Sequence, residues 1–230
     1  MAVNRGYGIG LQVFSDFINR EAIYVDKTAY VYKMAHTKAK NFFLCRPRRF
    51  GKSLLVDTLR CYFEGRKELF RGLAIDSLEK EWVQYPVIRL DLSSGKYYDL
   101  DSIYSIVGYI LETYEKKYGL PVRNDAKLGT RLTSIIMAAY EQTGREVVVL
   151  IDEYDAPMLD SIHKPDLQDQ LRERVRDLFS PLKAGGVPQV RLPHGHFQIL
   201  AAQRVQRAQQ PQVSPSTPNT RACAASPKRN

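Results

Sequence analysis

Cysteine is scarce in this chain of 230 residues, and a long apolar run is absent. The three cysteines are odd in number and share no spacing typical of a metal site, so they fit a reducing cytoplasm. The longest aliphatic run, residues 147–151, is far too short to cross a bilayer. The chain starts without a basic segment followed by an apolar one, so we expect no signal peptide and no membrane partner.

Acidic residues are missing from the last part of the chain, and their absence explains its basic character. The net charge is +9, but residues 187–230 contain six Lys and Arg and no Asp or Glu. Residues 1–186 therefore carry a net charge of only +3, nine less six. Because the high isoelectric point comes largely from one terminal segment, it gives no support for nucleic-acid binding.

Patterns of strands and helices alternate along residues 41–186, after an entry segment of residues 1–40 with short helices. We expect three apolar strands, at residues 41–45, 87–92 and 146–151. We expect four longer helices, over residues 52–63, from 103 to a stop at Gly119, from 128 to a stop at Gly144, and over 166–183. This alternation predicts an α/β fold with a parallel, doubly wound sheet flanked by helices.

A Gly-Lys-Ser sequence follows the first expected strand and begins the next helix. In phosphate-binding (Walker A) loops, several backbone N–H groups and the helix N-terminus face one anion. Gly51 would let the backbone approach the phosphates, Lys52 would contact the β- and γ-phosphates, and Ser53 would offer a hydroxyl to Mg²⁺. We expect the nucleotide-binding loop to comprise Pro47, Arg48, Arg49, Phe50, Gly51, Lys52 and Ser53.

Arg46 stands where the usual pattern has its first glycine. That glycine serves the turn, and Pro47 can take part of this role because its ring pre-sets one φ angle. Arg48 and Arg49 either contact phosphate or a neighbouring subunit, or simply face solvent. Taken alone, the loop can equally be a helix start that happens to read Gly-Lys-Ser.

A second motif, VVVLIDEYD, ends an aliphatic strand with two carboxylates. Parallel sheets bind ligands at the carboxyl ends of their strands. As in a Walker B motif, Asp152 would hold Mg²⁺ and Glu153 would activate the attacking water, with Lys52 as the other catalytic residue. The alternative is a pair of solvated acids, but the order of the two motifs favours binding of ATP with Mg²⁺.

These segments resemble the bacterial AAA-ATPase-like family of P-loop ATPases, which are often followed by a nuclease-like domain of the PD-(D/E)XK type. The resemblance covers residues 8 to about 184 and rests on YVDKTAYVYKM, NFFLCRPRRFGKSLLVDTLRCYFEGRKELFRGLAI, WVQYPVIRLDLS and REVVVLIDEYDAPML. It implies a P-loop NTPase-type sheet, ATP hydrolysis and an Arg46 in keeping with the family's own loop. The sequence assigns no chemistry to Tyr24, Asp26 and Lys27 of the entry motif, and no nuclease motif lies within these residues.

Residues 187–230 depart from the family, which continues with a buried strand resembling LRFVFLTGISKFS at the sensor position. Here the stretch reads PQVRLPHGHFQIL, although the codons for residues 194–198, read one nucleotide later, allow Thr-Gly-Ile-Ser-Lys. We therefore hypothesise that the chain is C-terminally truncated relative to the family and translated out of frame from about Val187. A genuine Pro- and Gln-rich tail is the alternative, and either predicts a disordered, low-complexity segment.

The resemblance places the sensor strand between the phosphate-loop strand and the Asp-Glu strand. Without it the sheet would be incomplete on its C-terminal side, with rows of unpaired backbone groups, unless residues 197–200 took its place. We therefore expect poor folding and weak or absent ATP hydrolysis. Three functions stay open: an ATPase, a nucleotide-dependent switch that gates an attached effector, or a non-functional fragment. The sequence defines neither an arginine finger nor an oligomeric state.

Overall fold

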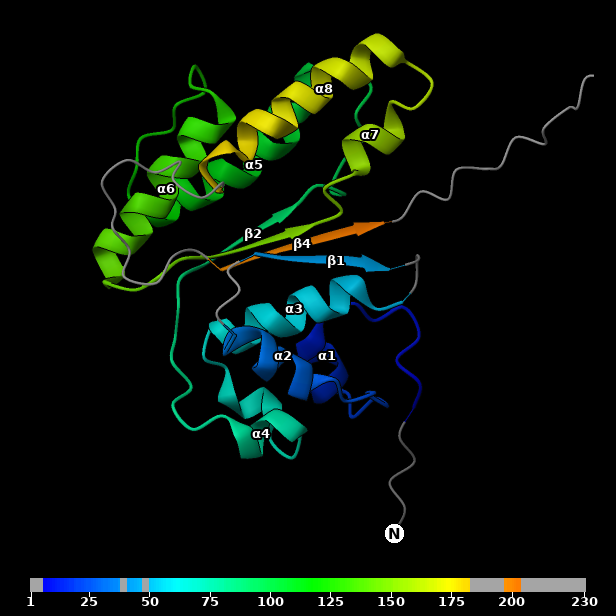
Figure 1. Ribbon diagram of the computed structural model, residues 1–230, viewed down its shortest axis with the longest axis vertical. Helices are drawn as coiled ribbons and strands as arrows, with labels where there is room; N and C mark the ends of the chain where they lie inside the picture. Colours follow the sequence, from blue (N-terminus) through cyan, green and yellow to red (C-terminus); the bar gives the residue numbers. More distant parts are fainter. Residues whose placement is uncertain (1–5, 38–40, 47–49, 183–196, 204–230) are drawn as a thin grey trace, which may run out of the picture.

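The computed structural model describes residues 6–37, 41–46, 50–182 and 197–203. At its centre lies a four-stranded sheet of order β1-β4-β3-β2 (Figure 1). The strands are β1 (Asn41–Arg46), β2 (Val87–Asp91), β3 (Val148–Asp152) and β4 (Phe197–Gln203). All three neighbouring pairs are parallel, so the carboxyl ends of the strands meet at one edge of the sheet. The predicted α/β fold with a parallel sheet flanked by helices is confirmed.

Two layers of helices cover the sheet (Figure 1). One layer contains α1 (Phe14–Asn19), α2 (Thr28–Ala35), α3 (Lys52–Phe63) and α4 (Ala74–Leu78), with a 3₁₀ turn at Lys67–Phe70. The other contains α5 (Asp101–Lys117), α6 (Leu128–Thr143), α7 (Ala156–Asp160) and α8 (Pro165–Leu178), with a 3₁₀ turn at Ser180–Leu182. Within the described ranges, no helix combines the length and the apolar character needed to cross a bilayer.

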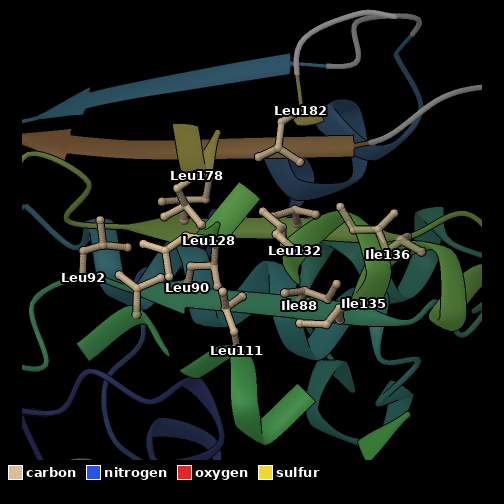
Figure 2. Close-up of a cluster of buried hydrophobic side chains, with 14 of the residues drawn as sticks. Ile88, Leu90, Leu92, Leu111, Leu128, Leu132, Ile135, Ile136, Leu178 and Leu182 are labelled. Atoms are coloured by element: carbon tan, nitrogen blue, oxygen red, sulfur yellow. The ribbon is translucent and has the colours of Figure 1, made fainter. Parts of the chain in front are cut away.

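The buried strand β3 contributes to a core on each face of the sheet. Successive side chains of a strand point to opposite faces, so Val149 and Ile151 pack toward α5, α6 and α8, whereas Val148 and Leu150 pack toward α3. Figure 2 shows the first of these cores. Its labelled members are Ile88, Leu90, Leu92, Leu111, Leu128, Leu132, Ile135, Ile136, Leu178 and Leu182. Burial on both faces explains why β3 is almost wholly aliphatic.

The C-terminal ends of two helices, α6 and α8, can be compared with the ends predicted from the sequence. Helix α6 ends before Gly144, which adopts φ 63° and donates its N–H to the Tyr140 carbonyl, as the glycine predicts. The helix expected to run to Lys183 ends instead at Leu178. Pro181 disfavours helical geometry at the residue before it and has no N–H to donate, so the chain tightens into a 3₁₀ turn.

Strand β4 lies between β1 and β3, in the segment for which no regular structure was predicted. Disorder is wrong for Phe197–Gln203, which pairs in parallel with both neighbours, and residues 197–200 take the place between β1 and β3 that the sequence analysis left open to them. Ile199, for example, is in register with Phe42 of β1 and with Leu150 of β3. The inner edges of β1 and β3 both need hydrogen-bond partners, and this short apolar stretch supplies them. The sheet is therefore continuous; the rest of the predicted tail lies outside the described residues.

Candidate nucleotide-binding site

Helix α3 begins at the carboxyl end of β1, and no side chain among the described residues caps its N-terminus. Gly51 precedes it in the left-handed conformation, with φ 70° and ψ 30°, and no atom of the described residues lies within 4 Å of the position that a Cβ atom would take there. The first turn contains no acidic residue. An uncapped helix start of this kind favours an anion, because its N–H groups and its dipole present positive charge.

Lys52, the first residue of α3, turns its side chain into the protein. Only 4% of the side chain is exposed, and its Nζ lies 3.4 Å from Oε1 of Glu153. Nζ has no hydrogen-bond partner among the described residues. Because a buried ammonium is costly without hydrogen bonds, this environment suits a lysine that gains a further anionic partner.

Asp152 ends β3 and is buried, opposite Asp91 at the end of β2. Burial raises the pKa of Asp152 and the negative charge of Asp91 raises it further, whereas hydrogen bonding with Ser53 and the charge of Arg89 act in the opposite direction. Its Oδ1 atom has no hydrogen-bond partner in the part of the chain that the structure describes. The carboxylate thus lies beside Ser53 with one oxygen available to a ligand.

Glu153 has a strained backbone. Its φ is 48°, in the left-handed region that costs a non-glycine residue about 1–2 kcal/mol. This conformation ends β3 abruptly and leaves the carboxylate 17% exposed beside Lys52. Strain of this kind concentrates at functional sites, where surrounding structure maintains it.

Arg89 of β2 is a residue of this site that the sequence analysis did not identify. Its Nη1 lies 3.3 Å from Oδ1 of Asp57 on α3, and its Nη2 lies 3.6 Å from Oδ2 of both Asp91 and Asp152. One guanidinium thus links three carboxylates from α3, β2 and β3. The signal was present in the sequence, because Arg89 and Asp91 alternate with Ile88 and Leu90 and therefore share one face of the strand.

The remaining predicted loop residues contribute less. Pro47, Arg48 and Arg49 lie outside the described residues, and Phe50 is 62% exposed. Among the described residues, no group of three or more His, Cys, Asp and Glu is arranged to hold a metal ion. The oxygen ligands present are Oδ1 of Asp152 and the Ser53 hydroxyl. They fit Mg²⁺, because in nucleotide sites this ion takes only one or two protein ligands and completes its coordination with phosphate oxygens and water.

A parallel sheet with a Gly-Lys helix start and an acidic strand end at one edge is typical of nucleotide-binding α/β proteins. A family model described as "Predicted AAA-ATPase" (AAA-ATPase_like) matches residues 8–191. The chain belongs to this AAA-ATPase-like family, as the resemblance predicted, and this membership supports nucleotide binding in general.

One relative of this chain comes from Azotobacter chroococcum mcd 1, where it is described as an uncharacterized protein in the vnfD 5′ region. The two are 34% identical over 179 residues, which cover 76% of this chain and 34% of the relative. The chain therefore spans about a third of the length of that relative. No solved structure matches the chain.

Proposed function

We propose that this protein binds ATP together with Mg²⁺ and hydrolyses it. The observation that carries the proposal is the meeting of Lys52 and Glu153, whose charged atoms lie 3.4 Å apart although they come from two strand ends that are not neighbours. The start of α3 and Asp152 lie at the same edge, and among the described residues nothing caps the helix and Oδ1 of Asp152 has no hydrogen-bond partner. Membership of a family of predicted ATPases supports the same conclusion.

The proposed binding groups are divided between the loop and β3. Backbone N–H groups around Gly51 and at the start of α3 bind the β- and γ-phosphates, together with the loop residues 47–50. Lys52 leaves Glu153 and contacts the same phosphates. Ser53 and Asp152 hold Mg²⁺, which neutralises charge on the phosphate oxygens when bound. Arg89 acts as a positioning residue, because its contact with Asp152 fixes the carboxylate.

Glu153 is the proposed general base. Once the phosphates draw Lys52 away, the carboxylate accepts a proton from the attacking water. The water oxygen forms a bond to the γ-phosphorus, and the bond from that phosphorus to the bridging oxygen of ADP breaks. The products are ADP and inorganic phosphate.

The second candidate is a nucleotide-dependent switch that binds ATP with little turnover and gates an attached effector, such as the nuclease-like domain that the family resemblance implies. The ion pair between Lys52 and Glu153 favours this candidate, because it occupies the proposed base. Binding of ATP would then release Glu153 for a conformational change rather than for catalysis.

Glu153→Gln separates the two candidates when ATP binding and phosphate release are measured on the same preparations. For an ATPase we expect the variant to bind Mg-ATP about as well as wild type and to release phosphate about 10²–10⁴ times more slowly. For a switch, wild type and variant release phosphate equally slowly. Glu141→Gln, at an exposed position of α6, is the matched control. Lys52→Ala should abolish ATP binding, and unchanged binding in that variant would refute both candidates.

A further inference from the structure

A cavity of about 620 Å³ lies at the edge of the sheet opposite the proposed nucleotide site. Its walls include Val87, which begins β2, and residues at or just after the C-terminal ends of α3, α5 and α6. Strand β2 runs from Val87 to Asp91, which is in register with Asp152, so about 13 Å of strand separates the cavity from that carboxylate. The volume lies within the roughly 300–1,000 Å³ of small-molecule sites, and the cavity can therefore hold a ligand of its own.

The charged walls of this cavity carry positive charge without an acidic partner. Arg66, Lys117 and Arg145 line it, and Glu64 is the only acid among its described walls. Oε2 of Glu64 lies 3.1 Å from Nη1 of Arg60, which neutralises that acid. Among the ion pairs between described residues, none includes Lys117 or Arg145. An anion that enters the cavity would therefore meet two unpaired cations.

The helix ends explain why basic residues gather here. A helix C-terminus carries a partial negative charge of about half an elementary charge and favours a cation nearby. Lys117 is the last residue of α5, and Arg145 follows the last residue of α6 by two positions. The partial charges are spread over backbone carbonyls, so they hold the two cations at these positions and leave the side-chain N–H donors available to a ligand.

Aromatic and neutral polar side chains complete the walls. Tyr85 and Tyr118 line the cavity, and Nζ of Lys117 lies 5.3 Å from the centroid of the Tyr118 ring. Burial raises the pKa of both tyrosines, so their hydroxyls remain hydrogen-bond donors over a wide pH range. Gln84 and Thr143 add an amide and a hydroxyl, which both donate and accept hydrogen bonds.

We propose that this cavity binds a mononucleotide unit, that is, a phosphate joined to a sugar and a base, as a ligand separate from ATP. The three basic side chains contact the phosphate, because hydrogen bonds between charged groups are the strong ones. The base packs against a tyrosine ring, and the amide and hydroxyl bind the sugar or the edge of the base. The evidence is local to these walls and does not depend on the net charge of the chain or on the proposed ATPase activity.

Two exposed basic residues of the cavity are suitable for substitution. The double variant Lys117→Gln/Arg145→Gln removes both unpaired cations and keeps polar side chains at the surface. The matched control, Arg123→Gln/Lys127→Gln, removes the same two charges at exposed positions outside this cavity. Lys52→Ala serves as a second control, because it changes only the proposed ATP site.

Isothermal titration calorimetry with uridine monophosphate and with a single strand of six uridylates tests the proposal. We expect Lys117→Gln/Arg145→Gln to lower the affinity at least about tenfold for whichever probe binds wild type more tightly. Both controls should stay within about twofold of wild type. Equal affinities for the two probes identify a free mononucleotide as the ligand, whereas tighter binding of the strand identifies a unit of single-stranded nucleic acid. Thermal melts check folding, and the single variants Lys117→Gln and Arg145→Gln provide the same test if the double variant unfolds.

Three results would overturn the inference. Wild type could bind neither probe, or the cavity variants could keep their affinity, and in both cases the cavity holds no nucleotide. If Lys52→Ala loses the probe instead, the nucleotide binds at the start of α3. None of these results refutes the proposed function, which is measured separately with Mg-ATP on the same preparations.

Discussion

Replacing Glu153 with glycine should stabilise the fold relative to the alanine variant, even though both changes remove the proposed base. The φ of 48° costs a residue with a Cβ atom about 1–2 kcal/mol, and glycine relieves this cost. Glycine also adds about 0.5–1 kcal/mol of conformational entropy to the unfolded chain. Because both variants lose the contact with Lys52 equally, we expect Glu153→Gly to be about 1 kcal/mol more stable than Glu153→Ala.

Thermal melts of the two variants measure this difference. For a chain of this size, about 1 kcal/mol corresponds to about 2–4 °C in Tm. Phosphate release should be lost in both variants, so the difference in stability between them is independent of activity. The same two substitutions at Glu141 in α6 are the control. The backbone there is helical, so the Glu141→Gly variant should be about 1 kcal/mol less stable than Glu141→Ala. If glycine is also the less stable residue at 153, the left-handed backbone and the reasoning built on it are refuted.

Four further predictions follow from the buried charges, the sheet and the reading frame. Because burial raises the pKa of Asp152, the folded chain holds its proton more tightly than the unfolded chain. Asp152→Asn should therefore be more stable than wild type at neutral pH, and urea melts should show this advantage shrinking as the pH falls toward the ordinary aspartate pKa of 3.8. Arg131→Met should cost about 3–5 kcal/mol, since it leaves Glu115 buried without its partner at 2.7 Å, and adding Glu115→Leu should restore most of that loss in the same melts. Ile199→Pro removes an N–H from a central strand and should abolish the cooperative melt seen by circular dichroism. Nucleotide sequencing across codons 180–215 should reveal a displaced reading frame, and in-frame codons unrelated to the family would end that hypothesis.

The bounds of a helix or strand were predicted best where apolar residues recurred at regular spacing and a residue that favours a start or an end stood beside them. Helix α3 has the predicted bounds, residues 52–63, because Gly51 sets its start and apolar residues recur at helical spacing along it. Strand β3 begins two residues later than predicted and extends one residue further, to Asp152. The short helices α4 and α7 were not predicted, since five residues are too few to show a period.

Long-range contacts explain what the sequence could not provide at the candidate site. The rule that parallel strands bind ligands at their carboxyl ends was enough to place Lys52 and Asp152 in one hypothesis. The ion pair between Lys52 and Glu153 depends on the left-handed turn after β3, for which a glutamate gives no signal. The pairing of Arg89 with Asp57 joins residues 32 positions apart, and only the packing of α3 against the sheet brings them together.

Strand β4 determines whether the proposed site can exist at all, because β1 and β3 have no direct pairing. The parallel registers on its two sides set the height of the phosphate-binding loop relative to Asp152 and Glu153. The family match ends at residue 191 and β4 begins at Phe197, so the strand that joins the two motifs lies beyond the matched segment. A segment beyond the family match can form this strand, because pairing between strands uses backbone N–H and C=O groups that almost any sequence without proline supplies. The proposed contacts of Lys52, Ser53 and Asp152 with nucleotide therefore depend on the backbone of β4, which holds their two elements at one edge of the sheet.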